Sequence, residues 1–347
     1  MQGKKIKEMF SKINVNTKQL VFICIIIFSF FSILKPTRFP TFRNFESMCF
    51  QFPEPGLFTL GIAITMLTAG ADLSIVAVAN LVATICGMLL LNVMPNDAGT
   101  AVQFGFVSLC FLVAIFVGLL CGCLNGFLIA KLGIFPILAT LGTQNLYTGI
   151  SSVLTKGQGV FGVFPDSLIF IGSGKLFGFL PMPFLLFLLV LIIVTILIHY
   201  TPYGLKTQWF GSNRRASYYC GIDNVRTVFT TYLMASLIGA LTGILILART
   251  NSAKYDYGTT YVLQAMLASV LAGVSPLGGK GYIPNIFLSV LALQMLDSGF
   301  NFLRITSFVR SSTYGILLIV SIAIEYVRES LKRLRNIKSL EQKNQKL

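Results

Sequence analysis

Long apolar runs alternate with short polar segments along the whole chain. A helix needs about 20 apolar residues to cross the hydrocarbon core of a bilayer, and most of the runs approach that length. The 57–94 run is nearly twice as long, and Gly70, Asp72 and Ser74 interrupt it near its middle. It therefore predicts two helices that meet at a break near residues 69–73. The runs cover residues 19–34, 57–94, 104–130, 136–154, 181–199, 229–248, 260–277, 283–296 and 308–327.

These runs, with the longest divided in two, predict an all-α polytopic membrane protein with about ten transmembrane helices. Several runs are too short for a straight span, which favours broken or re-entrant helices. We expect a basic tail over 1–18, a single transmembrane domain over 19–327 with a polar loop at 200–228, and a second basic tail over 328–347. Basic residues precede the first run, as in a signal peptide. No cleavage site follows it, so we expect a retained signal anchor.

Composition and charge agree with a membrane location. Hydrophobic residue types make up 55% of the 347 residues and charged types only 11%, whereas a soluble domain has about 25% charged residues. This deficit excludes a soluble enzyme, a secreted domain and a disordered chain. The net charge of +15 comes largely from the two ends of the chain. With an even number of spans, the positive-inside rule places both termini in the cytoplasm. No basic stripe interleaved with aromatic residues indicates a nucleic-acid partner.

The sequence offers no catalytic chemistry. The glycines around Lys280 do not form a nucleotide-binding P-loop, because the spacing fails and Gly281 follows the lysine. The seven cysteines have no pattern of a metal site or disulfide framework. We therefore expect no metal, no cofactor and no catalytic residue, and infer that the protein moves a solute across the membrane.

Polar residues at two glycine-containing breaks are candidates for the translocation pathway. An acid at the centre of a span costs roughly 2.5–3.5 kcal/mol, so Asp72 at the first break is a notable feature. Asp72 and Ser74 have two compatible interpretations, as pathway residues or as N-caps of the following helix. The second break, at 271–281, contains Gly273 and Ser275. Interrupted helices in both halves of a transporter point to the substrate site.

Asn125 and Thr140 are further polar residues in apolar surroundings. We place them in the same candidate pathway. The alternative is that they make interhelical hydrogen bonds, worth about 0.6 kcal/mol each.

The 200–228 loop contains a predicted short helix. Asn213 is a suitable N-cap, a helix-compatible stretch follows, and Gly221 can end the helix. Arg214 and Arg215 would suit an interfacial anchor. A docking helix for a cytoplasmic partner is the other interpretation.

Five motifs, in order, resemble those of permease subunits of bacterial ABC importers for ribose and other simple sugars. The first, L-T-A-G-A-D-L-S at 67–74, is similar to the family's L-T-G-G-I-D-L-S, and the resemblance extends over about 57–328. Ala69 and Ala272 each replace the first glycine of a Gly-Gly pair, and Pro276 replaces a leucine. The motifs lie at 67–74, 122–131, 136–142, 211–222 and 271–281.

The resemblance implies a transport subunit in a bacterial inner membrane, with a ribose-like sugar as its solute. It implies three protein partners: a cytoplasmic ATPase, a second permease chain, and an extracytoplasmic sugar-binding protein. The short helix, with Gly211, Asn213, Ala216 and Gly221, would couple the permease to the ATPase. The family also includes permeases for galactose, xylose, furanosyl signalling compounds and, more distantly, nucleosides.

Three other functions remain as alternatives. An ion-coupled secondary transporter needs intramembrane acids or histidines that relay charge, and we find only Asp72 and Asp297 in or near the spans. A membrane-embedded enzyme needs a nucleophile–base pair, paired acids or a metal set. A scaffold would not require a buried acid and glycine-containing breaks.

Overall fold

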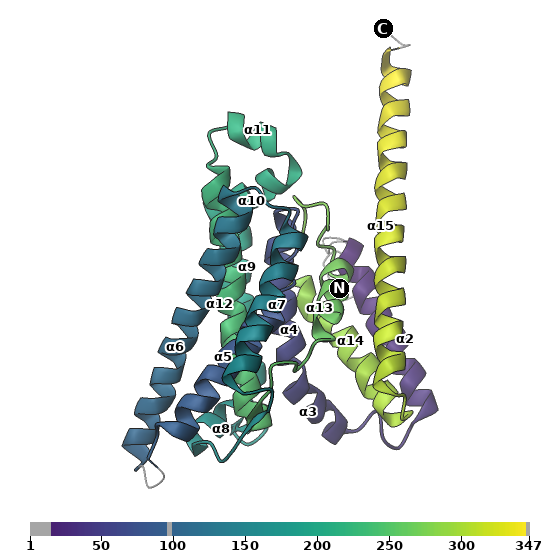
Figure 1. Cartoon of the computed structure of the whole chain (residues 1–347). Helices are drawn as coiled ribbons and strands as arrows, with labels where there is room; N and C mark the ends of the chain where they lie inside the picture. The colour runs from purple at the N-terminus through teal and green to yellow at the C-terminus, as the bar shows by residue number, and fades with distance from the viewer. Residues whose placement is uncertain (1–14, 96–98, 345–347) are drawn as a thin grey trace.

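The computed structural model describes residues 15–95 and 99–344, and this part of the chain is almost entirely helical (Figure 1). Most of the predicted N-terminal tail lies outside the described residues. The helices are α2 (Val15–Leu34), α3 (Phe42–Gln51), α4 (Pro53–Leu67), α5 (Ile75–Asn92), α6 (Thr100–Gly126), α7 (Pro136–Leu154), α8 (Asp166–Ser173), α9 (Met182–Tyr200), α10 (Pro202–Ser212), α11 (Arg214–Tyr219), α12 (Asn224–Thr250), α13 (Tyr261–Leu271), α14 (Asn285–Phe302) and α15 (Ser307–Asn344). A π-helical turn, Phe127–Lys131, continues α6.

The strands are short, and each pair holds two loop segments together. Two antiparallel pairs form among the described residues, each strand being two residues long. Strand β1 (Val160–Phe161) pairs with β4 (Ser252–Ala253), and β2 (Lys175–Leu176) pairs with β3 (Leu180–Pro181).

The fold confirms a multi-pass helical membrane protein. In the described part of the chain, six helices are long and apolar enough to cross a membrane, and α4 and α13 are shorter apolar helices. The break predicted inside the 57–94 run is confirmed, because α4 ends at Leu67 and α5 begins at Ile75. The six span candidates are Asn16–Leu34, Ile75–Asn92, Thr100–Lys131, Met182–Tyr200, Asn224–Thr250 and Ser307–Ile324.

Besides α11, which the sequence predicts, three helices lie in the segments between the apolar runs. They are α3, α8 and α10, of 10, 8 and 11 residues. Each is much shorter than a span, and α3 and α10 are less apolar, so a search for long apolar runs does not detect them. The α15 helix continues from the last predicted span to Asn344 without a break.

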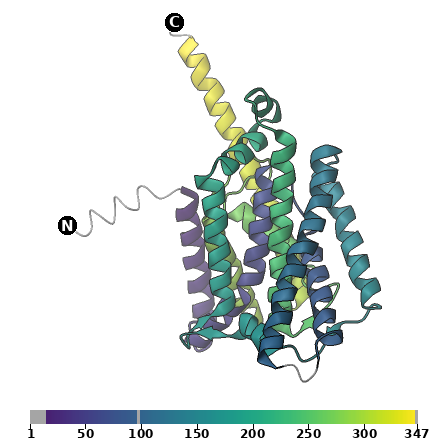
Figure 2. The same cartoon turned by 90° about the vertical axis from the view of Figure 1, so that its left-hand side faces the viewer.

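Helix α12 runs through the middle of the molecule, between α6, α5 and α4 (Figures 1 and 2). Glycines allow this close approach: a Cβ on Gly122 of α6 would lie 2.7 Å from the Leu233 Cα of α12, and one on Gly243 of α12 would lie 2.3 Å from the Ala79 carbonyl oxygen of α5. The Gly239-x-x-x-Gly243 spacing therefore serves helix packing, as small residues do in membrane proteins. In contrast, α2, α6, α9 and α15 expose many large apolar side chains, which suits contact with lipid.

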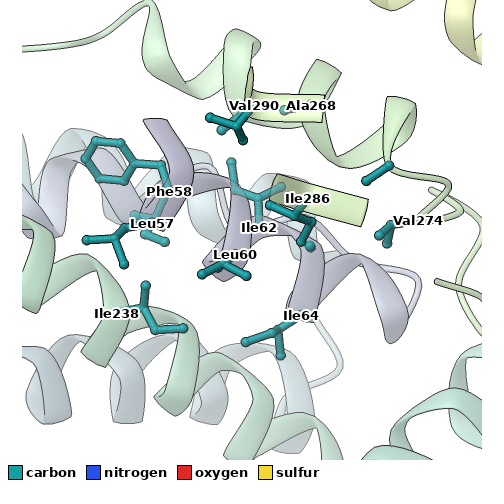
Figure 3. Packing of buried hydrophobic residues seen from close by; sticks show 14 of the residues in the cluster. Leu57, Phe58, Leu60, Ile62, Ile64, Ile238, Ala268, Val274, Ile286 and Val290 are labelled. Carbon is teal, nitrogen blue, oxygen red and sulfur yellow. The ribbon is translucent and has the colours of Figure 1, made fainter. Parts of the chain in front are cut away.

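The largest apolar cluster surrounds α4, every residue of which is buried. A helix that is apolar on all sides belongs in the interior. Figure 3 shows its side chains packed against α12, α13 and α14. The labelled residues are Leu57, Phe58, Leu60, Ile62 and Ile64 from α4, and Ile238, Ala268, Val274, Ile286 and Val290 around it.

Candidate translocation site

The first break holds a fully buried carboxylate. Asp72 Oδ1 accepts hydrogen bonds from the Ser74 backbone N–H (2.9 Å) and from Ser74 Oγ (2.6 Å). The Asp72 N–H in turn donates to Thr65 Oγ1 in the last turn of α4 (3.1 Å). Ser74 precedes α5 and its side chain makes no capping bond, and the Asp72 carboxylate bonds no amide within α5. The N-cap interpretation is therefore wrong for the Ser74 side chain. The Asp72 carboxylate accepts from the N–H of Ser74, the residue that precedes α5, so both interpretations of Asp72 remain predictions.

Polar side chains from α6 and α7 extend this cluster. Asn125 Nδ2 donates to Ser74 Oγ (2.9 Å), and Asn125 Oδ1 accepts from Thr143 Oγ1 (2.7 Å). Thr140 Oγ1 donates to the Ala71 carbonyl oxygen (3.1 Å). The interhelical hydrogen bond expected of Asn125 is confirmed by its bond to Thr143. Thr140 bonds the break and, within its own helix, the Pro136 carbonyl oxygen (2.9 Å). These bonds place four predicted site residues around the break. All four side chains are buried: Asp72, Ser74, Asn125 and Thr140.

Two polar atoms beside this break have no hydrogen-bond partner among the described residues: Asp72 Oδ2 and the hydroxyl of Tyr232 on α12. The Tyr232 hydroxyl touches the break, because a Cβ on Gly70 would lie 2.3 Å from it. Buried polar groups are normally paired, and leaving one unpaired costs about 1–3 kcal/mol. The arrangement therefore has unused hydrogen-bonding capacity. The sequence analysis missed Tyr232, since a single tyrosine in a long helix carries no recognisable signal.

The second break is built differently. Ser275 N–H donates to the Lys280 carbonyl oxygen (2.9 Å), and Ser275 Oγ accepts from the Leu277 N–H (3.3 Å). Gly273 has a φ of +87° and lies against Asn16 of α2. Gly273 and Ser275 thus form a compact loop and make none of the hydrogen bonds around Asp72.

The two breaks nevertheless meet at the end of α10. The Gly279 N–H, in the second break, donates to the Leu67 carbonyl oxygen at the end of α4 (2.9 Å). Gly211 fills the angle between them: a Cβ there would lie 1.9 Å from the Leu67 oxygen and 2.5 Å from the Gly279 nitrogen. Only a glycine allows three backbone segments to approach so closely.

The short helix predicted in the 200–228 loop is confirmed as α11. Asn213 Oδ1 caps it by accepting from the backbone N–H groups of Arg215 (3.0 Å) and Ala216 (3.1 Å). Gly221 follows it with a φ of +76°. The outer surface of α11 presents Ala216 and the large side chains of Tyr218 (70% exposed) and Tyr219 (86% exposed).

A buried ion pair joins α4 to the end of α12, and the sequence analysis did not identify it. Arg249 donates from Nε to Glu54 Oε1 (2.5 Å) and from Nη2 to Glu54 Oε2 (2.9 Å). The Tyr257 hydroxyl completes the group, 3.1 Å from Arg249 Nη2 and 3.3 Å from Glu54 Oε2. Glu54 and Arg249 are 195 positions apart in the sequence, so no local pattern could have revealed the pair.

Comparison with known proteins gives a consistent result. A family profile described as "Branched-chain amino acid transport system / permease component" matches residues 44–323. The ribose import permease protein RbsC of Bacillus subtilis (strain 168) is 31% identical over 307 residues, which cover 88% of this chain and 90% of that protein. The autoinducer 2 import system permease protein LsrD of Photorhabdus luminescens is 29% identical, over 81% of this chain and 84% of that protein. The D-allose transport system permease protein AlsC of Escherichia coli (strain K12) is 27% identical, over 88% and 90%. No solved structure matches the chain significantly.

Proposed function

Because the chain belongs to the family of branched-chain amino acid transport system permease components, we propose that it is the membrane-spanning subunit of an ABC importer for a simple sugar. The substrate class follows the relatives, whose names specify ribose, allose and autoinducer 2. A separate ATPase subunit supplies the energy, since the chain has no P-loop of its own. An extracytoplasmic binding protein delivers the sugar, and a second permease chain, identical or related, completes the pathway.

One observation carries this proposal: the loop that bears α11 is in direct backbone contact with both breaks. Gly211 of α10 touches Leu67 and Gly279, and α11 begins three residues later. The exposed Ala216, together with Tyr218 and Tyr219 (70% and 86% exposed), gives α11 a surface for a partner. When ATP-driven closure of the ATPase moves a docked α11, the movement reaches both broken helices through Gly211. This is how rigid elements transmit a conformational change.

The proposed topology has about ten membrane segments, with α11 and both termini on the cytoplasmic side of a bacterial inner membrane. Helices occupy all ten segments that the apolar runs predict. In Figure 1, α11 and the C-terminal end of α15 lie at the same end of the molecule, and the other view agrees (Figure 2). Basic residues concentrate in 1–18 and 328–347, which supports a division into two cytoplasmic tails and one transmembrane domain over 19–327.

In this proposal, the pathway runs beside the first break, where Asp72, Ser74, Asn125 and Thr140 meet. The unpaired Asp72 Oδ2 supports the role, because a polar solute or water would supply the missing donor. Gly273 and Ser275 act differently. They shape the second break, which moves with the first through the Gly279–Leu67 hydrogen bond.

The test is reconstitution. The chain would be purified together with an ATPase subunit and a binding protein from the same organism and placed in proteoliposomes. We expect uptake of D-ribose or D-allose that requires ATP hydrolysis and the binding protein, and that persists when ionophores collapse ion gradients. Uptake that ionophores abolish, without any need for ATP, would instead establish an ion-coupled transporter. Uptake of adenosine or L-leucine in place of the sugars would reassign the substrate class.

A further inference from the structure

A polar cavity of about 280 Å³ lies away from the Asp72 cluster. Its walls come from the ends of α3 and α4, the loop before α13, and from α13, α14 and α15. Gln264 and Gln294 form a buried floor, whereas Thr260 and Asn301 on its rim are exposed. The cavity is therefore a pocket that opens to the surface, and none of the six predicted pathway residues lines it.

An acid, Asp297, lines this cavity. Asp297 Oδ2 accepts from Gln264 Nε2 (2.8 Å), and Asp297 Oδ1 accepts from the Tyr314 hydroxyl. Each carboxylate oxygen has two lone pairs, so each can accept another hydrogen bond. Arg310, one turn before Tyr314 on α15, donates from Nη2 to Asn301 Oδ1 (2.7 Å) and the Ile305 carbonyl oxygen (3.2 Å), while its buried Nε has no partner among the described residues. The cavity wall thus carries a carboxylate with spare acceptor capacity, a guanidinium and several amide groups.

Aromatic rings complete the wall. Tyr257, Tyr261 and Tyr314 all line the cavity, and the rings of Tyr257 and Tyr261 meet edge to face at a centroid distance of 6.3 Å. A monosaccharide presents hydroxyl groups that donate and accept hydrogen bonds around its edge, and C–H groups on its faces. An aromatic face receives the C–H groups, and the carboxylate, amides and guanidinium receive the hydroxyls. The wall is richer in polar groups than most small-molecule sites, which suits a ligand that carries a hydroxyl on nearly every carbon.

The position of the cavity suits solute arriving from outside. Helix α12 has 27 residues and is therefore about 40 Å long. Its N-terminus adjoins α11, and its C-terminus leads into the loop that carries Tyr257. The α3 end of the molecule lies opposite α11 in Figure 1. If α11 faces the cytoplasm, the cavity opens toward the side where a binding protein releases its sugar.

We propose that this cavity is the outer binding site for a monosaccharide on its way to the broken helices. The inference rests on the proposed importer function and adds a site to it. A branched-chain amino acid is the competing ligand that the family description raises. Its charged groups would find Asp297 and Arg310. However, Pro55 is the only wholly aliphatic side chain among the described residues of the wall. Apart from the tyrosine rings, the amino acid's branched hydrocarbon group would therefore meet mainly polar side chains.

The first test measures transport kinetics. Asp297→Asn preserves the shape of the side chain but replaces one acceptor oxygen with a donor. We expect the KM for the transported sugar, D-ribose or D-allose, to rise at least tenfold while the maximal rate stays within about threefold. The matched control is Ser298→Ala, the next residue on α14. Its hydroxyl donates to Asn44 Oδ1 outside the cavity (2.7 Å), and its KM should not change.

The second test detects the ligand directly and needs no transport. In a background with Cys49, Cys123 and Cys220 changed to serine, Ser311→Cys places one thiol in the cavity wall. D-ribose or D-allose should slow its reaction with a water-soluble maleimide several-fold in nanodiscs. The control is Ser47→Cys on α3, which is exposed and outside the cavity and should react at the same rate with or without sugar.

The outcomes separate this inference from the proposed function. ATP-dependent sugar uptake with an unchanged KM for Asp297→Asn, and no protection of the Ser311→Cys thiol, would overturn the cavity site and leave the importer function standing. Protection by L-leucine and not by either sugar would also overturn it. If uptake is ATP-independent while sugar protects the thiol, the site stands and the importer function fails. If Asp297→Asn does not reach the membrane, Tyr314→Phe takes its place in the kinetic test. It removes one hydroxyl from the same wall and should raise the KM in the same way.

Discussion

The backbone N–H of Gly279 donates a hydrogen bond to the carbonyl oxygen of Leu67 across 2.9 Å, so the two interrupted helices of this protein touch at their interruptions. The two breaks also begin alike. After α4, the N–H groups of Ala69 and Gly70 bond back to the last turn of the helix, and after α13 those of Gly273 and the next residue do the same. Each pair forms a Schellman motif. The left-handed residue of the motif is Ala69 in one break and Gly273 in the other.

Ala69 and Gly273 should respond to substitution with opposite signs. Holding an L-residue at positive φ costs the folded state about 1–2 kcal/mol. A new glycine lowers the free energy of unfolding by about 0.4–1 kcal/mol, because it gives the unfolded chain more conformational entropy. Ala69→Gly should therefore leave stability unchanged or raise it by up to about 1.6 kcal/mol. Gly273→Ala should lower stability by about 1–2 kcal/mol, because its Cβ would also lie 2.5 Å from Asn16 Nδ2. Thermal unfolding of both purified variants checks the difference, and equal shifts would contradict it.

Gly211→Ala should uncouple transport from ATP hydrolysis. Its Cβ would lie 1.9 Å from the Leu67 carbonyl oxygen, so the α10 end must move away from both breaks. Overpacking of this kind costs roughly 1–3 kcal/mol. Sugar uptake per ATP hydrolysed should fall at least fivefold in proteoliposomes. Gly149→Ala in α7 is the control, since nothing lies within 4 Å of its Cβ position. Normal coupling in Gly211→Ala would remove this junction from the transmission pathway.

Asp72→Asn should impair transport much more than folding. The amide oxygen can still accept from the Ser74 N–H and hydroxyl, so the turn is retained while the charge beside the pathway is lost. We expect near-normal amounts in the membrane and at least tenfold slower uptake. Asp72→Ala should show the same loss and an added destabilisation of about 1–3 kcal/mol, because it leaves buried donors unpaired. Loss of Asp72→Asn from the membrane would show that the carboxylate is only structural.

Ala216→Asp should weaken binding of the ATPase more than Arg214→Ala does. Ala216 is exposed on the surface of α11. A docked partner would strip water from an aspartate at this position, and the cost of that desolvation would weaken binding. Arg214 lies over the ring of Phe210 at 5.0 Å, and exposed charges at the rim of an interface affect mainly association rate and salt dependence. Co-purification with the ATPase and sugar-stimulated ATP hydrolysis measure the two effects. Intact assembly and stimulation in Ala216→Asp would leave α11 as a membrane-surface anchor.

Local physical chemistry explains what the sequence alone determined about this protein. Apolar length predicts helices that cross a membrane. A glycine and an acid, Gly70 and Asp72, in the middle of a run predict a break, because both effects are local in the sequence. The Asn213 cap and the Gly221 stop define α11 for the same reason. The motifs also indicated the transporter family without reference to any fold.

The tertiary structure decided which of these local features meet. Gly211, Leu67 and Gly279 are far apart in the sequence, and their contact depends on how α4, α10 and the second break pack together. The Glu54–Arg249 pair, the Tyr232 hydroxyl at the first break and the cavity around Asp297 likewise depend on long-range packing. A single side chain in an apolar run has the same local environment whether or not it will have a partner. Only the packing of the helices supplies the partner, and therefore the site.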